Sequence, residues 1–231
     1  MPYEKAKVTS YVLYGLSAAV FAGQCIWSVM GISPFERLGM FVLTAVLLHI
    51  ASAIRICNSD AQTQQRIMKR TYCLMFGLYL LLFLTFVFLD GYFDDDIRSA
   101  AEHKGGSLRD YIENSASFVP FESTRGLLYG YKMNWITPEK PFVNIVGNLL
   151  LCLPYAFFLP LFFRKQHNFF VFFLTVSGIS CMVEATQLLT RRGICDIDDL
   201  IYNVVGACVV FGFLHIKPVR KLLKKITKLQ Y

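Results

Sequence analysis

The sequence predicts an all-α, polytopic membrane helix bundle with about six transmembrane helices, and three observations support this fold class. Hydrophobic residues make up 55% of the 231 residues and charged residues only 17%, whereas soluble domains contain about a quarter charged residues. Several long stretches are almost free of charge, each near the ~20 apolar residues that cross a bilayer. The 21 phenylalanines exceed what one soluble core of this size would bury. A soluble enzyme and a disordered chain are therefore excluded.

The predicted spans are the stretches that lack charge. The first is far longer than the ~7–15-residue core of a secretory signal peptide, so we expect a retained helix. The fifth contains a single acid, Glu184. The six spans are residues 8–35, 38–54, 71–89, 141–163, 169–190 and 200–216.

Lys and Arg predict the orientation of these spans. An even number of spans places both termini on one side, and the side richer in Lys and Arg is the cytoplasmic one. With cytoplasmic termini, fourteen of the 23 cations are inside, and the short connections show the contrast most clearly. We therefore predict a multi-pass protein of the cell membrane with cytoplasmic N- and C-termini.

The chain divides into four predicted regions. Residues 1–90 hold three N-terminal transmembrane helices, and residues 91–140 form one extracytoplasmic loop of about 50 residues that is too small to bury its own core. Residues 141–216 form a three-helix core, and residues 217–231 form a basic cytoplasmic tail suited to anionic lipid. The net charge of +7 does not indicate nucleic acid, because no groove-reading module is present.

Polar side chains recur on one face of each of the last three spans. Steps of three and four residues place them on common helix faces near the outer surface. An acid in hydrocarbon costs roughly 2.5–3.5 kcal/mol on insertion scales, so we expect the three faces to pack together around one outer-leaflet pocket. The fourth span contributes Asn144, Gly147 and Asn148, the fifth Ser177, Ser180, Glu184, Gln187 and Arg191, and the sixth Asp199, Asn203 and Gly206, preceded by Arg192, Asp196 and Asp198.

Each residue type in this predicted pocket has an expected role. The candidate acid–base groups are Glu184, Asp196 and Asp199, and the candidate ligand-binding residues are Asn144, Asn148, Gln187, Arg191, Arg192, Asp198 and Asn203. The acids Asp196, Asp198 and Asp199 offer hard oxygen ligands for Mg²⁺ or Ca²⁺, although their spacing fits no EF-hand. Gly147 and Gly206 are expected to allow close helix packing and Pro154 to kink its helix. Structural alternatives are interhelical hydrogen bonds and an N-cap role for Asp198 or Asp199.

These residues resemble the VanZ-like family. The family pattern appears here as Pro120-Phe121, Asn144 with Gly147-Asn148 and Pro154, Glu184 with Gln187, and Arg192, Asp196, Asp198-Asp199, Asn203 and Gly206. The match covers roughly residues 118–212. Two departures, Cys152 with Ala156 and Cys195, affect apolar or small positions and leave the polar set whole.

The resemblance implies a Gram-positive cell-envelope membrane protein linked to resistance against glycopeptide antibiotics, teicoplanin above all. One hypothesis is an enzyme that acts on a membrane lipid or lipid-linked envelope precursor. Another is a non-catalytic protein that binds such a lipid or an acylated antibiotic. A small transporter or flippase is less favoured, because no inverted repeat is visible and the polar faces do not continue to the inner surface. No cysteine or serine nucleophile with an adjacent base is apparent.

Overall fold

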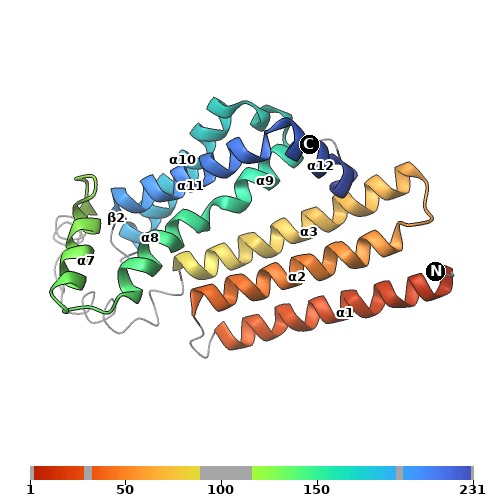
Figure 1. The fold of residues 1–231 in the computed structure, drawn as a ribbon, viewed down its shortest axis with the longest axis horizontal. Helices are drawn as coiled ribbons and strands as arrows, with labels where there is room; N and C mark the ends of the chain where they lie inside the picture. Colours follow the sequence, from red (N-terminus) through yellow and green to blue (C-terminus); the bar gives the residue numbers. More distant parts are fainter. Residues whose placement is uncertain (1–2, 29–32, 89–115, 191–194, 230–231) are drawn as a thin grey trace. The chain divides into compact units, whose positions relative to one another are not determined.

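The computed structural model describes residues 3–28, 33–88, 116–190 and 195–229, which are almost entirely helical (Figure 1). Within these described ranges, six helical segments are long and apolar enough to cross a membrane: Glu4–Ile26, Phe35–Arg55, Ala61–Val87, Glu139–Phe162, Phe169–Leu189 and Ile197–Leu214. The predicted all-α polytopic bundle is thus confirmed. The orientation of the termini stays a prediction.

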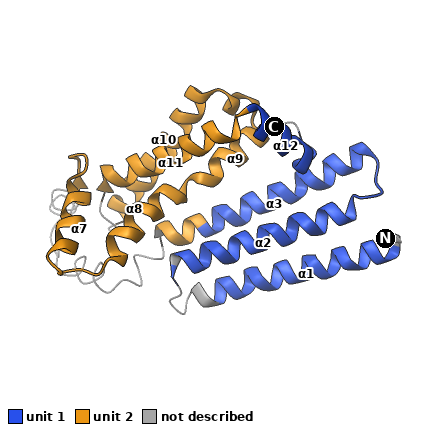
Figure 2. Ribbon diagram, viewed as in Figure 1, with its two compact units in different colours: residues 1–82, 217–231 blue, residues 83–216 orange. Residues whose placement is uncertain are grey.

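Two compact units make up the chain (Figure 2). The first comprises residues 1–82 and 217–231, and the second comprises residues 83–216. The four regions predicted from the sequence stay a prediction, and half of the predicted 91–140 loop, residues 91–115, lies outside the described residues.

The first unit contains α1 (Tyr3–Ser28), α2 (Pro34–Arg55) and most of α3 (Ala61–Phe88), which run side by side (Figure 1). A chain of hydrogen-bonded hydroxyl groups, one from each helix, connects them. The Tyr14 hydroxyl lies 2.8 Å from Ser52 Oγ, which lies 2.6 Å from Thr71 Oγ1. Such interhelical hydrogen bonds supply attraction that lipid-like side chains alone do not give within a membrane.

Two predicted span boundaries were wrong because local capping signals decide them. The predicted span 8–35 continues past the end of α1, since Ser33 caps a new helix: Glu36 N donates to Ser33 Oγ and the Glu36 carboxylate accepts from Ser33 N. This capping box with a proline at the first turn is a strong helix start. The third helix begins ten residues before the predicted Thr71, and Asp60 accepts from Thr63 N at that start.

The C-terminal helix α12 (Lys217–Thr227) is amphipathic and belongs to the first unit. Its cations alternate with Val219, Leu222, Leu223 and Ile226, and Leu222 and Ile226 are exposed. A basic helix with an exposed apolar face is typical of segments that lie in a membrane interface.

The second unit contains the last three spans and the short elements that precede them. These are β1 (Ala116–Ser117), α7 (Glu122–Lys132), α8 (Glu139–Leu151), α9 (Leu153–Phe162), the 3-10 turn η1 (Arg164–His167), α10 (Phe169–Leu189), β2 (Cys195–Asp196) and α11 (Ile197–Leu214). The fourth span is therefore two helices, interrupted at Cys152, and Pro154 lies in the first turn of α9. Proline lacks a backbone N–H and is tolerated in the first turn of a helix, so the interruption lies two residues before Pro154, where the sequence predicted a kink.

Helix α11 is the centre of this unit and packs against α8, α9 and α10. Phe172 of α10 stacks on Phe211 of α11 with ring centroids 4.4 Å apart. One turn away from this pair on the same two helices, Val176 of α10 and Ala207 of α11 are fully buried. The opposite faces of α10 and α11 expose large apolar side chains such as Leu174, Met182 and Val209, as expected where a helix meets lipid.

Candidate functional site

The carboxyl groups near the start of α11 form the core of the candidate site. Glu184 lies near the end of α10, and Asp196, Asp198 and Asp199 lie at the start of α11. Asp199 is within electrostatic range of the other three. Glu184 is only 5% exposed, so this acid faces the protein and not lipid. The sequence periodicity thus does bring these acids together; we call them the carboxylate cluster.

Asp199 is the member of the cluster that joins α11 to α8. Asn148 Nδ2 donates a hydrogen bond of 2.5 Å to Asp199 Oδ1, and the side chain of Asn144 also interacts with the Asp199 carboxyl group. Both amides lie one turn apart on α8 and are half-buried, as is Asp199. These three residues therefore keep partial access to a ligand while belonging to the membrane-spanning helices.

Glu184 joins the cluster through the backbone. One of its carboxylate oxygens accepts a hydrogen bond of 3.1 Å from Asp196 N. This contact fixes the β2 segment against the end of α10. The neighbouring Cys195 is also close to these acids. Burial raises the pKa of its thiol, and the nearby carboxyl groups of Glu184 and Asp196 raise that pKa further.

Asp196 is the N-cap of α11. It is buried, and its Oδ1 accepts from Asp198 N at 2.9 Å. The prediction that Asp198 or Asp199 caps this helix was therefore wrong by two or three residues. The cap is Asp196 because it is the last residue with extended backbone before the helix, as N-cap geometry requires.

Asp198 caps a different helix, which the sequence did not indicate. Its Oδ1 accepts from Phe121 N, and its Oδ2 accepts from Thr124 N at 3.0 Å and from Thr124 Oγ1 at 2.8 Å. These donors surround the start of α7, whose own N-cap residue provides no side-chain bond. Asp198 is 1% exposed. A buried carboxylate at a helix N-terminus satisfies free N–H groups and complements the helix dipole.

The structure adds residues that sequence reasoning missed. Tyr202 of α11 hydrogen-bonds to Thr124 through hydroxyl groups 2.9 Å apart, and the exposed Arg125 is within electrostatic range of Asp198. Phe121 has a left-handed backbone, φ 65°, which is rare for a bulky residue. The Pro120-Phe121 pair was the one available signal, because it precedes this contact directly. The parallel pairing of β1 with β2 also places the segment before α7 next to the segment before α11.

The remaining predicted residues divide into several groups. Gln187 Nε2 donates to the Val87 carbonyl at 3.1 Å, so it caps the end of α3. Asn203 is 2% exposed and donates to Ser180 Oγ at 3.3 Å, while its Oδ1 has no hydrogen-bond partner among the described residues. Arg191 and Arg192 lie outside the described residues. The prediction of close helix packing at Gly147 was wrong, since a Cβ there would meet no atom within 4 Å. At Gly206 the helices do pack closely, and a Cβ there would clash with the Leu149 backbone.

The acids Asp196, Asp198 and Asp199 are the candidate oxygen ligands for Mg²⁺ or Ca²⁺ in the sequence. Among the described residues, no group of three or more His, Cys, Asp or Glu side chains is arranged to hold a metal ion. Asp196 and Asp198 direct carboxylate oxygens to backbone N–H groups, as described above.

Fold and site together define a polytopic membrane protein with a polar site in which amides of α8 contact the Asp199 carboxyl group near the start of α11. The family model described as VanZ/LLP1 matches residues 74–218, well over half of the chain. The chain belongs to this VanZ-like family. No curated protein and no solved structure matches it.

Proposed function

We propose that this chain is a cell-envelope membrane protein of the glycopeptide-resistance type whose carboxylate cluster binds the polar head of a membrane lipid or lipid-linked envelope precursor. The contact between Asn148 and Asp199 is the observation that most supports this proposal. It joins an amide and a carboxyl group within apolar spans, where such groups usually line a binding cavity or pathway. Membership of the VanZ/LLP1 family is consistent with this envelope role.

The hydrogen bonds that the site residues already make indicate which of them would contact the ligand. Asp196 and Asp198 are occupied by helix capping, as the hydrogen bonds above show. Asp199, Asn144 and Asn148 are half-buried and offer both acceptors and donors. A headgroup with hydroxyl, amide or amine groups would match them.

An enzyme is the second candidate, and the pairing of Glu184 with Asp199 favours it. Two carboxyl groups on neighbouring helices can divide the roles of general acid and general base between them. Glu184 keeps one oxygen on Asp196 N, and Asp199 is within electrostatic range of it. In this case the reaction would be a proton-assisted cleavage or transfer at the bound headgroup, with the lipid or precursor as substrate.

One experiment tests the proposal and separates its two forms. Wild type, Glu184→Gln, Asp199→Asn and Asn148→Ala are expressed in a susceptible Gram-positive host at matched membrane levels. Teicoplanin and vancomycin sensitivities are compared, and envelope lipids are profiled by mass spectrometry. Asp60→Asn, an exposed acid of the first unit, is the control.

Lost teicoplanin resistance with an unchanged lipid profile supports binding. A lipid product that disappears with Glu184→Gln supports an enzyme. Wild-type behaviour of Glu184→Gln, Asp199→Asn and Asn148→Ala contradicts the proposal. The predicted orientation is tested alongside it: residues 91–140 contain no cysteine, and a single cysteine introduced there should react with a membrane-impermeant probe added from outside the cell.

A further inference from the structure

Helix α12 carries a row of lysines along one side. Steps of four and three residues place Lys217, Lys221 and Lys224 on a common face. These three lysines and the adjacent Lys225 are all exposed. Residues 217–231 contain no Asp or Glu, so no carboxylate of this segment neutralises the row. The exposed side of α12 is therefore strongly cationic.

A second side of α12 is apolar and exposed, while a third side is buried. Leu222 and Ile226 lie one turn apart and are 54% and 42% exposed. Thr227 is buried, and Leu223 one turn before it is half-buried, so this third side faces the first unit, to which α12 belongs. The lysine row and the pair of Leu222 and Ile226 thus point outward from the protein on two different sides of the helix.

The chain connection fixes where α12 begins relative to the bilayer. The membrane-spanning helix α11 ends at Leu214, and α12 begins at Lys217. Three residue steps extend over at most about 10 Å. The polar headgroup layer is about 5–8 Å thick on each side of the hydrocarbon core. The first turn of α12 therefore lies in or immediately beside the layer that holds the phosphate groups of the lipids.

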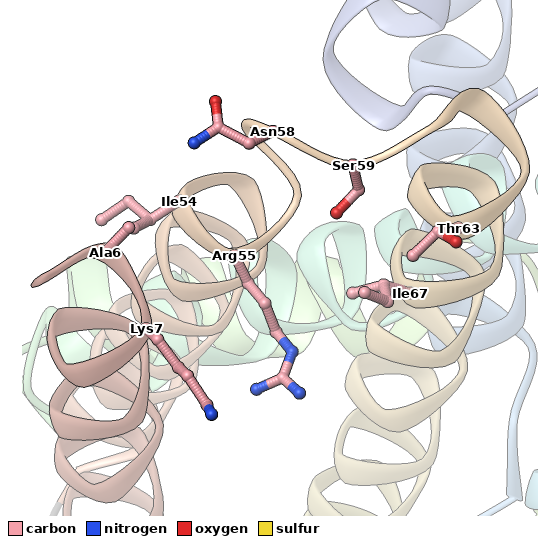
Figure 3. Close-up of a pocket in the computed structure, with 8 residues that line it drawn as sticks. All are labelled: Ala6, Lys7, Ile54, Arg55, Asn58, Ser59, Thr63 and Ile67. Carbon is pink, nitrogen blue, oxygen red and sulfur yellow. The ribbon is translucent and has the colours of Figure 1, made fainter. Parts of the chain in front are cut away.

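A cavity in the first unit lacks a comparable arrangement of cations. It has a volume of about 170 Å³ and is lined by residues of α1, α2, α3 and the turn between α2 and α3 (Figure 3). The Arg55 guanidinium lies over the Tyr11 ring, 5.1 Å from its centroid, and the Asn58 amide points away from the ends of Lys7 and Arg55 (Figure 3). These groups do not surround one anion, whereas the lysines of α12 form a continuous row.

We propose that α12 binds the anionic headgroups of the membrane surface. The helix lies in the membrane plane, with Leu222 and Ile226 between the upper parts of the acyl chains and the lysine row against lipid phosphates. An acidic protein or a nucleic acid would pair with the lysines but leave the two apolar side chains in water, whereas a bilayer covers both sides. This surface contains no residue of the carboxylate cluster, so the proposal is independent of the proposed function.

The test measures hydrogen exchange of residues 217–227 in the full-length protein. The protein is placed in phosphatidylcholine nanodiscs with increasing phosphatidylglycerol. Nanodiscs leave both membrane faces open, so the result does not depend on the orientation of the chain. Thermal unfolding in phosphatidylcholine verifies that each variant is folded.

Two variants and one matched control separate charge from apolar contact. The cation variant is Lys221→Gln with Lys224→Gln and Lys225→Gln. The apolar variant is Leu222→Ser with Ile226→Ser. The control removes three exposed cations of α3 and is Arg66→Gln with Lys69→Gln and Arg70→Gln.

We expect phosphatidylglycerol to slow exchange across α12 in the wild type and in the control, and added salt to reverse this effect because it screens exposed charges. The cation variant should lose about tenfold or more of this protection, since the attraction of three lysines to an anionic surface exceeds one decade in affinity. The apolar variant should also lose protection, because its side chains no longer favour the membrane.

Equal exchange of wild-type α12 in phosphatidylcholine and in phosphatidylglycerol overturns the proposal, as does equal protection of the cation variant and the control. Full protection of the apolar variant overturns the position of the helix within the interface. A second arm adds polyglutamate to phosphatidylcholine nanodiscs. Protection by polyglutamate without protection by phosphatidylglycerol would identify an acidic protein as the partner and overturn the lipid.

Discussion

Gly206 of α11 lies directly against the backbone of Leu149 in α8: a Cβ atom on Gly206 would stand 2.0 Å from the Leu149 carbonyl oxygen. Real Cβ contacts are never this short, so only glycine permits this approach. Leu149 follows Asn148, and Gly206 lies two helical turns after Asp199. The close approach of the two backbones therefore helps to place the amide and the carboxyl group within one hydrogen bond of each other.

Gly206→Ala should destabilise the protein by about 1–3 kcal/mol or more, because the clash is with backbone and cannot be relieved by a flexible side chain. The measurement is thermal unfolding of the detergent-purified protein. Gly147→Ala is the matched control, since a Cβ there meets no atom within 4 Å. Equal stability of the two variants would mean that α8 and α11 are not in close contact.

Asp198→Asn and Thr124→Val should each loosen α7 from α11. The carboxylate accepts three hydrogen bonds from the start of α7, and a buried group left without its partner costs about 1–3 kcal/mol. Hydrogen exchange should therefore become faster across 122–132 while α10 is unaffected. Ser123→Ala, at the adjacent position, should leave this exchange unchanged. A uniform rise in exchange over the whole second unit would contradict a local capping role.

A double-mutant cycle should detect the contact between Asn148 and Asp199. We expect the Ala variants at the two positions to be non-additive by about 0.5–3 kcal/mol in unfolding free energy, the range found for groups in direct contact. As a control, Asn148→Ala combined with Thr186→Ala should be additive, because the Thr186 hydroxyl donates to the Met182 carbonyl of its own helix. Additivity of both pairs would remove the central contact of the proposed site.

The thiol of Cys195 should react slowly with maleimide at neutral pH. Its pKa is raised by burial and then by the carboxyl groups of Glu184 and Asp196, so the reactive thiolate forms only at higher pH than for an ordinary cysteine. In a variant with Cys195 as its single cysteine, the rate should rise as pH increases. Glu184→Gln removes one of these acids and should shift that rise to lower pH. No shift would mean that Glu184 is not close to Cys195.

Much of the fold was predictable because membrane insertion depends on local composition. Charge-free stretches indicated the six spans, and the steps between Ser180 and Glu184 indicated a buried face on α10, where both side chains are indeed buried. The helix starts were less predictable. Ser33 and Glu36 form a recognisable capping box, but it falls within a continuous apolar stretch, where hydropathy alone gives no boundary.

The roles within the carboxylate cluster were not predictable, because they depend on contacts distant in sequence. Asp198 is separated from its partner Thr124 by more than seventy residues. Gln187 has the helical spacing of a site residue, yet it donates to the carbonyl at the end of α3. Periodicity states which face of a helix a residue occupies. It does not state which neighbour will offer the matching donor or acceptor.

The sequence by itself determined that several acids and amides must share the interior of a membrane bundle, because hydrocarbon does not accept such groups unpaired. Only the tertiary structure decided which of them maintain the fold and which stay accessible. Asp196 and Asp198 are used by helix N-termini, while Asp199 meets Asn148 across the close approach at Gly206. The physical reason is that a carboxylate bonds the nearest free donors, and only packing brings those donors near.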